Sequence, residues 1–424
     1  MDQMSVVGRS FRRKDAVDKV LGRTLFSADI KMHGMLEAKI LRSQVPHALV
    51  KKIETQTAQD FPGVVAVFTA EDIPASNSHG IIIKDEPVLV KDKIRKIGDP
   101  LALVVAETEE SASQALEAIK VELELLPAVF DPEIAMKPDS VAIYPNGNIL
   151  ERRKIRKGDV VEAFKQAEFV VENKYCTQMA EHAYIEPEAG IAYVDGENVV
   201  VHVSTQNPHF DRKEVARNLS LPLNKVRIIQ APTGGAFGGK LDISVQVLLA
   251  LAAFKTKRPV RLVYSRKESI LASTKRHPFV IYYKTAADQY GRLLGIEATI
   301  IADGGAYASY GPATITRAAV HLTGPYEVPN VKIDAYIVYT NNPTAGAMRG
   351  FGAPQAAFAY EQQMDLLAER VGMSPFEIRM LNALKNGSVT ATDQVLNSGV
   401  GISQTLEQAY ATAQQIIFPG GLRP

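Results

Sequence analysis

The chain has 424 residues, of which 46% are hydrophobic and 22% charged, as is ordinary for a globular protein of two or three domains. Its net charge of +1 gives no general attraction to nucleic acid or to an acidic membrane surface, so we expect neither as a partner. The single cysteine, Cys176, excludes an internal disulfide, a zinc site with two cysteines and an iron–sulfur cluster ligated by this chain alone. The start of the chain holds no apolar signal segment, and the longest apolar run, 245–254, is about half of a membrane span. These features predict a cytoplasmic protein.

The first third of the chain predicts an extension followed by an α/β domain. Residues 1–25 are polar and rich in arginine and lysine, and we expect them to lie across another surface rather than to fold alone. Residues 26–130 form the predicted domain, with strands at 35–41, 64–68, 101–106 and 121–125 and a helix at 109–120. Four prolines between positions 127 and 148 predict a linker, placed at residues 131–156.

Residues 157–424 predict a second, larger α/β unit. Strands are predicted at 169–175, 191–194, 225–230, 260–264, 279–285 and 293–301, and an alternating pattern predicts one at 199–204; a hairpin at 289–292 joins the strands 279–285 and 293–301. Helical spacing indicates helices at 159–165, 208–219, 242–254 and 355–371. A further helix is predicted to begin at Pro375, with Ser374 as its N-cap and Gly372 ending the helix before it.

A glycine-rich loop, residues 231–240 (APTGGAFGGK), lies between the predicted strand at 225–230 and the predicted helix at 242–254. Four glycines within six residues allow positive φ and close approach of a ligand, and a helix N-terminus adds a positive dipole, so we interpret the loop as an anion or cofactor cradle. Two alternatives stay open. Residues 234–240 fit the first seven positions of the nucleotide-binding pattern GxxxxGK[ST], but Leu241 replaces the hydroxyl that binds Mg²⁺. The loop could also be a tight turn that packs helix on strand.

Two more glycine clusters follow, at 303–306 and 349–354, and three such turns in one domain favour a large polar cofactor over simple packing. Arg349 is either a fixed cation for a phosphate or a metal-oxo group, or a surface arginine. Gln206, at a strand end, either donates its amide into the same crevice or faces solvent. Arg317, in an apolar stretch of small residues, is either a buried charge with a partner or a cation that faces the substrate.

Other reactive residue types give weaker signals. Glu181, His182, Glu186 and Glu188 match no zinc spacing, and we expect them to be structural rather than metal ligands. Cys176 has no nucleophile signature around it and is interpreted as a small buried hydrophobic residue. The chain also lacks GxSxG, HExxH and GxGxxG patterns in a suitable context.

Four segments together resemble the molybdenum hydroxylases, the xanthine dehydrogenase/aldehyde oxidase family. They are EHAYIEP at 181–187, STQN at 204–207, GGAFGGK at 234–240 and AMRGFGAPQ at 347–355, in the expected order. The segments 46–48, 62–64 and 98–100 are similar to the "hammerhead" domain of that family. The resemblance implies an α/β (α+β) fold, with an a/b hammerhead domain followed by the first molybdopterin-binding domain.

The same resemblance implies roles for individual residues around a molybdenum–molybdopterin cofactor, in its cytosine dinucleotide form. The metal is held by the pterin and not by protein side chains, so no direct metal ligand is expected. Gln206 is expected to donate toward an oxo or chalcogen ligand, and Arg317 to bind charge on the substrate. The backbone residues expected at the cofactor are Gly235, Ala236, Phe237, Gly238, Met348, Arg349 and Gly350, and Phe351 and Leu241 are expected at the substrate.

The resemblance also implies partners and a reaction. Longer members of the family carry a second molybdopterin-binding domain with the catalytic glutamate, which we expect on a second, smaller subunit, beside subunits that carry FAD and [2Fe–2S] clusters and pass electrons to NAD(P). Leu241 stands where purine hydroxylases have a substrate-binding glutamate, which favours an N-heteroaromatic ring with fewer hydrogen-bonding groups. The expected reaction is hydroxylation by water-derived oxygen, with nicotinate converted to 6-hydroxynicotinate. Xanthine or purine dehydrogenation and hydroxybenzoyl-CoA reduction are the alternatives within the family, and a nucleotide-binding protein or a non-catalytic scaffold are those outside it.

Overall fold

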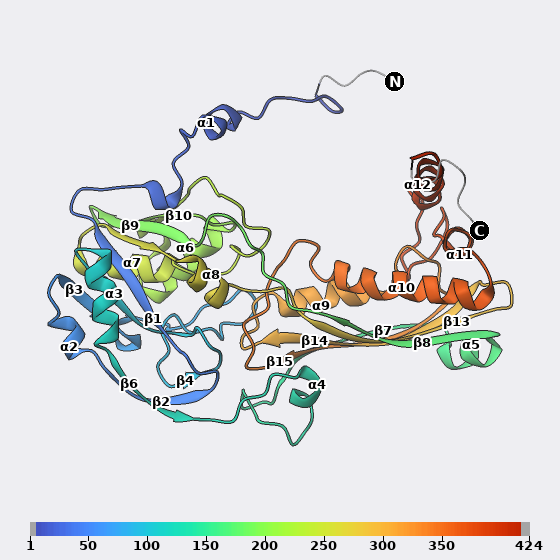
Figure 1. Cartoon of the computed structure of the whole chain (residues 1–424), viewed down its shortest axis with the longest axis horizontal. Helices are drawn as coiled ribbons and strands as arrows, with labels where there is room; N and C mark the ends of the chain where they lie inside the picture. Colours follow the sequence, from blue (N-terminus) through green and yellow to red (C-terminus); the bar gives the residue numbers. More distant parts are fainter. Residues whose placement is uncertain (1–5, 417–424) are drawn as a thin grey trace.

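The computed structural model describes residues 6–416, which fold into two lobes joined side by side (Figure 1). The N-terminal part contains α1 (Ala16–Val20), η1 (Ser27–Asp29), β1 (Leu36–Arg42), β2 (Ala48–Glu54), α2 (Gln56–Gln59), β3 (Val64–Phe68), η2 (Ala70–Asp72), β4 (Lys93–Ile94), β5 (Pro100–Ala106), α3 (Glu109–Glu117) and β6 (Lys120–Leu125). Then follow α4 (Pro132–Ala135), β7 (Ile149–Lys157), α5 (Val160–Gln166), β8 (Phe169–Thr177), β9 (Ala189–Asp195), β10 (Asn198–Val203), α6 (Pro208–Asn218), η3 (Leu223–Lys225) and β11 (Val226–Gln230). The remainder contains α7 (Gln246–Thr256), β12 (Val260–Val263), α8 (Arg266–Ala272), β13 (Phe279–Ala287), β14 (Leu293–Gly305), α9 (Gly311–Val320), β15 (Asn330–Tyr339), α10 (Ala353–Val371), α11 (Pro375–Asn382) and α12 (Ile402–Ile416).

The first lobe is built on a seven-stranded mixed sheet in the order β11-β10-β9-β12-β1-β5-β3. Strand β1 pairs in parallel with β12, more than 200 residues later in the chain, so the N-terminal α/β unit and residues 189–263 share one sheet. Helix α7 is apolar on all sides and lies in the core of this lobe, with Leu249 and Leu251 fully buried. A small sheet, β4-β2-β6, completes the lobe.

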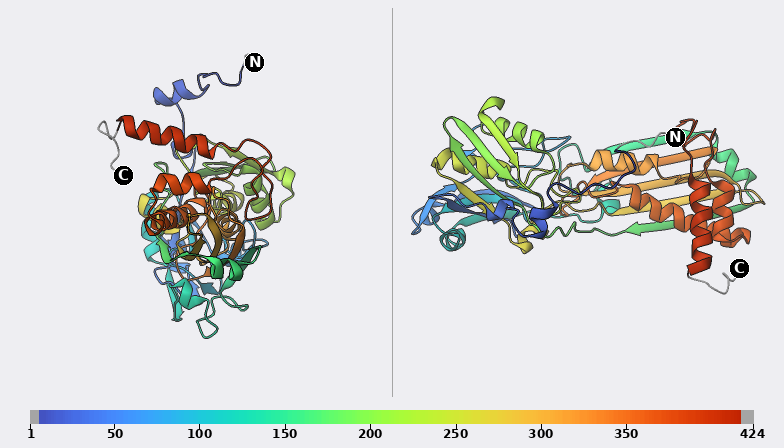
Figure 2. Two further views of the ribbon diagram at one scale, coloured as in Figure 1. Left: turned by 90° about the vertical axis from the view of Figure 1, so that its right-hand side faces the viewer. Right: turned by 90° about the horizontal axis from the view of Figure 1, so that it is seen from above.

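The second lobe is a five-stranded sheet in the order β7-β15-β14-β13-β8, with α9 and α10 on one face (Figures 1 and 2). Its core is formed by the alternating inward side chains of β13, β14 and β15, such as Ile281, Ile300 and Ile333, and by the apolar faces of the two helices. Helix α10 ends at Gly372, which has φ +80, and the Ser374 capping box opens α11.

Most predicted strands and helices are confirmed to within a few residues, and four predictions are corrected. The segment predicted as a linker is packed: Asp131 caps α4, Ile143 is 1% exposed, and β7 is an edge strand of the second sheet. The boundary between the two sheets therefore does not fall at residues 131–156, because the later strands β9 to β12 return to the first sheet. The domain limits 26–130 and 157–424 stay a prediction. Gly304 and Gly305 are not in an open turn but end β14, where a Cβ at Gly305 would lie 2.1 Å from the Pro343 carbonyl oxygen.

The other two corrections concern α7 and the cysteine. Helix α7 begins at Gln246 and not at 242, because residues 241–245 form an irregular segment that packs between the lobes. The prediction that the glycine loop leads directly into a helix N-terminus was therefore wrong. Cys176 is exposed rather than buried, because it alternates with the inward-facing Tyr175 on the edge strand β8.

The described part of the N-terminal extension, residues 6–25, projects away from the first lobe (Figure 1). Helix α1 has no buried residue, and its ion pairs are local ones between Asp15 and the neighbouring Arg13 and Lys19. This geometry agrees with a segment that does not fold alone.

Candidate cofactor and substrate site

The structure brings Gln206 against the glycine loop. Gln206 follows β10, and its side-chain oxygen accepts hydrogen bonds from the backbone N–H groups of Gly238 (3.1 Å) and Lys240 (3.3 Å). The Gln206 backbone N–H also donates to the Lys240 carbonyl at 2.9 Å. Because the oxygen is engaged by two donors, the side-chain NH₂ is the end that faces outward, and within residues 6–416 it has no partner.

The glycine loop presents a row of free donors beside this amide. Among the residues that the structure describes, the backbone N–H groups of Gly235, Ala236 and Phe237 donate no hydrogen bond. Gly235 has φ +100 and Phe237 has φ +52, a conformation that non-glycine residues seldom adopt and that is common at functional sites. Successive free N–H groups in such a turn form a concave binding site for an anion or an oxo group.

The third glycine cluster closes one side of this cradle. The Arg349 N–H donates to the Phe237 carbonyl at 2.9 Å, so the loops 231–240 and 347–352 are hydrogen-bonded to each other. A Cβ on Gly238 would lie 2.5 Å from the Ala347 carbonyl oxygen, which explains why only glycine fits there. The same carbonyl accepts a hydrogen bond from His182 Nε2 at 2.8 Å, and burial lowers the pKa of His182, so the ring is neutral.

Lys240 points into the protein and not into the cradle. The residue is 3% exposed, and its ammonium group donates to Glu186 Oε2 (2.9 Å), the Glu186 carbonyl (2.8 Å) and Ser204 Oγ (2.9 Å). Glu186 in turn accepts a hydrogen bond from the Gly234 N–H at 2.7 Å. The nucleotide-binding interpretation is therefore wrong, because that loop needs its lysine free for phosphate and a helix directly after it.

The segment 181–188 supports both glycine loops from behind. The Tyr184 side chain lies against Gly235 and Gly239, where added Cβ atoms would meet it at 3.1 and 2.8 Å, and its hydroxyl donates to Glu188. Glu181 pairs with Lys275 at 2.7 Å. In the described part of the chain no three His, Cys, Asp or Glu side chains are grouped as metal ligands.

The predicted substrate residues lie along α9. Phe351, with φ +51, packs edge-on against Tyr310 with ring centroids 5.7 Å apart, and Tyr310 is the N-cap of α9. Gly352 contacts the same helix at Thr314. Helical spacing then places Arg317 on the face that carries Tyr310 and Thr314. Leu241 is half-buried at the end of the glycine loop.

The two predicted cations are not buried. Within the described residues, neither the Arg317 nor the Arg349 guanidinium forms an ion pair or a hydrogen bond. Arg317 is thus not a buried charge with a partner, and its role toward a substrate stays a prediction. Arg276, whose Nη2 donates to the Arg349 carbonyl at 2.8 Å, adds a positive charge beside Arg349.

Sequence reasoning missed several residues that hold the site together. Lys240, Glu186 and Tyr184 position the first loop, and Arg276 positions the second. Tyr310 was not predicted at all, although its place directly before a helix with Pro312 in its first turn is a capping signal. The buried lysine could not be recognised from sequence, because lysine is rarely buried and its partner lies 54 positions away.

Comparison with known proteins identifies the family. Residues 143–383, more than half of the chain, match the family described as "Molybdopterin cofactor-binding domain". The chain belongs to this family. The hammerhead prediction is confirmed for the other part of this molybdopterin-binding chain, since residues 21–127 match "Aldehyde oxidase and xanthine dehydrogenase, a/b hammerhead domain".

Relatives of this molybdopterin-binding chain include subunits of larger enzymes. It is 50% identical over 413 residues to the nicotinate dehydrogenase large molybdopterin subunit of Eubacterium barkeri, covering 97% of each chain. It is 40% identical to a probable xanthine dehydrogenase subunit of Bacillus subtilis, over 93% of this chain and 53% of the relative. The solved aldehyde oxidoreductase of Desulfovibrio gigas superposes with a TM-score of 0.92 at 32% identity, over 96% of this chain and 47% of that one. The chain thus spans about half the length of the latter two proteins.

The residues of this structure fit the head of a molybdopterin cofactor. Three free N–H groups at 235–237 and the free Gln206 amide are donors suited to the oxygen and chalcogen atoms that surround the metal. The neighbouring Arg276 and Arg349 add positive charge beside the second loop, which suits an anionic group. None of the helices within residues 6–416 is long and apolar enough to cross a membrane.

Proposed function

We propose that this chain is the large molybdopterin-binding subunit of a multi-subunit molybdenum hydroxylase that acts on an N-heteroaromatic ring, with nicotinate hydroxylated to 6-hydroxynicotinate. The observation that carries the proposal is the position of the Gln206 side chain on the glycine loop, whose N–H groups at residues 235–237 are free among the described residues. The identity of 50% to a nicotinate dehydrogenase large molybdopterin subunit, over 97% of both chains, supports the same assignment.

In this proposal the bound molybdenum–molybdopterin, in its cytosine dinucleotide form, supplies the two-electron oxidation and the water-derived oxygen. The protein residues hold this cofactor and orient it. Gly235, Ala236, Phe237 and Gly238 line the metal head, and Gln206 donates an N–H toward its oxo or chalcogen ligand. Met348, Arg349 and Gly350 line the pterin side, where Arg349 offers a cation that no described residue pairs.

The substrate contacts follow from the residues along α9. Arg317 binds the carboxylate of nicotinate through charge-assisted hydrogen bonds. Phe351, held edge-on by Tyr310, stacks on the ring. Leu241 offers the pyridine ring an apolar contact that needs no hydrogen-bonding group, whereas a purine would leave several of its polar groups unpaired there.

The remaining parts of the enzyme are proposed on partner chains. A smaller molybdopterin subunit supplies the second half of the site and the glutamate that acts as base, and other subunits carry [2Fe–2S] clusters and FAD toward NADP. The greater length of the Bacillus and Desulfovibrio relatives supports a second half, and the single cysteine requires that iron–sulfur clusters be ligated elsewhere. We place the complex in the cytoplasm, where such a chain with no disulfide is stable.

A purine dehydrogenase is the second candidate, because the chain is 40% identical to a probable xanthine dehydrogenase subunit. The test is to purify the complex that contains this chain from its native host, measure its molybdenum and pterin, and assay nicotinate and xanthine side by side. Molybdenum with turnover of nicotinate supports the proposal, and turnover of xanthine alone replaces it with the second candidate. A complex without molybdenum would refute both and leave the non-catalytic scaffold.

A further inference from the structure

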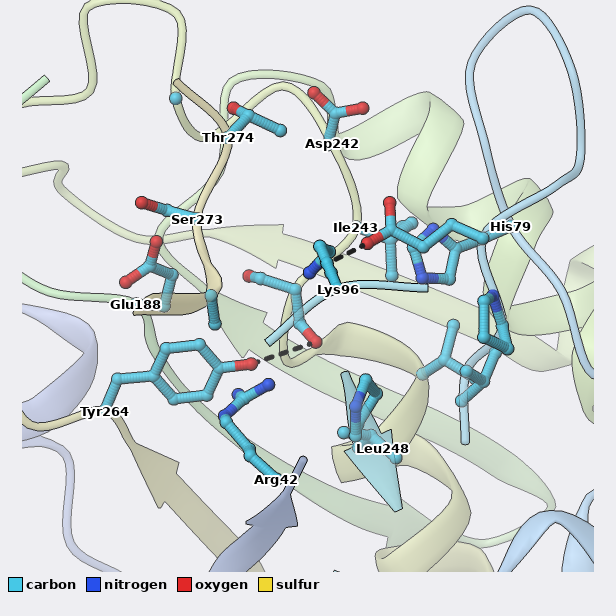
Figure 3. Close-up of a pocket in the computed structure, with 18 residues that line it drawn as sticks. Arg42, His79, Lys96, Glu188, Asp242, Ile243, Leu248, Tyr264, Ser273 and Thr274 are labelled. Atoms are coloured by element: carbon cyan, nitrogen blue, oxygen red, sulfur yellow. Dashed lines mark hydrogen bonds and ion pairs between the residues drawn. The ribbon is translucent and has the colours of Figure 1, made fainter. Parts of the chain in front are cut away.

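A polar chamber lies behind the glycine loop, where the segment 42–100 meets the second part of the chain (Figure 3). Its volume is about 50 Å³. Gly239, a residue of the glycine loop, lines it, so the chamber adjoins this loop. The charged and hydroxyl side chains around it include those of Arg42, Glu86, Lys96, Glu188, Asp242 and Tyr264.

Buried hydrogen-bond acceptors and a buried hydrogen-bond donor lack partners around this chamber. Glu188 is 2% exposed, and only one of its carboxylate oxygens is engaged, by the Tyr184 hydroxyl. Asp242 is 8% exposed, and one of its oxygens accepts from Ser309 Oγ at 2.9 Å while the other has no partner among the described residues. On the donor side, Arg42 Nη2 is also unpaired there.

Water is the ligand that this mixture of groups requires. Water both donates and accepts, so it satisfies free carboxylate oxygens and a free guanidinium nitrogen together, which neither a single cation nor a single anion can do. A water molecule needs roughly 15 Å³ of such space and two to four polar partners. The chamber meets both conditions for more than one molecule.

The contacts of Lys96 with its two acidic neighbours also leave room for water. Lys96 is buried, and its ammonium group lies 3.8 Å from Glu86 Oε1 and 3.6 Å from Asp99 Oδ1, which is too long for a direct hydrogen bond. Polar contacts at this separation are commonly bridged by water. Burial raises the pKa of Glu86 to about 8, so this group is protonated at neutral pH.

Ser309 lies between the second cofactor loop and the chamber wall. Ser309 is 2% exposed and has φ +41, and its Oγ would lie 2.8 Å from a Cβ on Gly346, directly before the Ala347 carbonyl that packs on Gly238. The Ser309 hydroxyl donates to Asp242, whose second oxygen is one of the unpaired atoms. Burial raises the pKa of Asp242 to about 6, which suits a group that takes up and releases protons near neutral pH.

We propose that this chamber is a water-filled proton-exit path, in which protons released at the cofactor loops pass through the Ser309 hydroxyl to Asp242 and then to chamber water beside Glu188. The inference rests on the proposed function. Hydroxylation of an aromatic C–H by water yields C–OH, two electrons and two protons. The electrons leave to iron–sulfur and flavin centres on partner chains, and the path described here takes the protons.

The test uses the complete complex with its cofactors. Asp242→Asn keeps the shape of the side chain but cannot accept the proton, and Ser309→Ala removes the hydroxyl at a second point of the path. We expect each variant to lower kcat about tenfold or more, with KM and molybdenum content unchanged and a larger solvent deuterium isotope effect. A high-resolution crystal structure of the wild-type complex is expected to show ordered water in the chamber in contact with Asp242 and Glu188.

Asp303→Asn is the matched control. Asp303 is as deeply buried and burial also raises its pKa to about 6, but it lies in the other lobe, where Thr340 and Asn342 satisfy it. Its variant is expected to keep the wild-type isotope effect. A dry chamber, or a wild-type isotope effect in both Asp242→Asn and Ser309→Ala, would overturn the inference while leaving the proposed function intact. A wild-type complex that hydroxylates no heteroaromatic ring would overturn the proposed function, and the proton path with it.

Discussion

Gly238 is the position where the two cofactor loops come closest, and Gly238→Ala tests whether their contact builds the site. The substitution adds a Cβ 2.5 Å from the Ala347 carbonyl oxygen and 2.9 Å from its carbon. Ordinary contacts begin near 3.4 Å, so the second loop must move away by nearly 1 Å. That movement strains or breaks the Arg349 N–H bond to the Phe237 carbonyl.

A control variant separates the stability lost through this close contact from the stability lost by placing alanine at positive φ. Gly238 has φ +107 and Gly387 has φ +92, but an added Cβ at Gly387 meets nothing within 4 Å. Both alanine variants carry a backbone penalty of about 1–2 kcal/mol. Only Gly238→Ala adds overpacking of about 1–3 kcal/mol and a lost hydrogen bond of about 1 kcal/mol. We therefore expect it to be less stable than Gly387→Ala by about 2–4 kcal/mol.

The assay is urea denaturation of the two variants in parallel, with molybdenum analysis of the purified complexes. Gly238→Ala is expected to unfold at a lower urea concentration and to retain little molybdenum, while Gly387→Ala keeps nearly the wild-type metal content. Equal stability and equal metal content in the two variants would show that the 347–352 loop can move away without loss of stability or of molybdenum. Its contact with Gly238 would then not shape the site.

Substitutions of single side chains test four further predictions. Gln206→Leu removes both the acceptor for two loop N–H groups and the free amide, and steady-state kinetics are expected to show kcat reduced about 10²-fold or more. Arg317→Ala is expected to raise KM for nicotinate at least about tenfold with Arg317→Lys intermediate, whereas Arg370→Ala, an exposed arginine on α10, leaves KM unchanged. Lys240→Met leaves the largely buried Glu186 carboxylate without its counter-charge, so chemical denaturation should show a loss of about 3–5 kcal/mol and nucleotide binding should be absent in variant and wild type alike. Asp242 has a folded pKa of about 6, above its ordinary 3.8, so stability should fall by roughly 3 kcal/mol as pH rises from about 4 through 6, and a denaturation series should lose this component in Asp242→Asn.

The sequence by itself determined the local elements and the landmarks of the site. An alternating pattern set β6 and a short apolar run set β3, and the Ser374–Glu377 capping box set the start of α11, because these signals act between residues that are neighbours in the chain. The glycines at 234–239 and 350–352 likewise marked turns whose backbone has no room for a Cβ. Such local requirements restrict which residue types can occupy a position, so they can be recognised in the sequence.

The tertiary structure alone decided how those landmarks meet and what they do. It placed Lys240 against Glu186 and not in the cradle, joined β1 to β12 in one sheet, and turned Cys176 outward on an edge strand. It also set Asp242 against Ser309 at the wall of a chamber that no motif predicts. Each of these outcomes depends on contacts between segments tens to hundreds of residues apart. Such contacts are selected by burial and by hydrogen-bond satisfaction across the whole fold, and therefore leave no local pattern in the sequence.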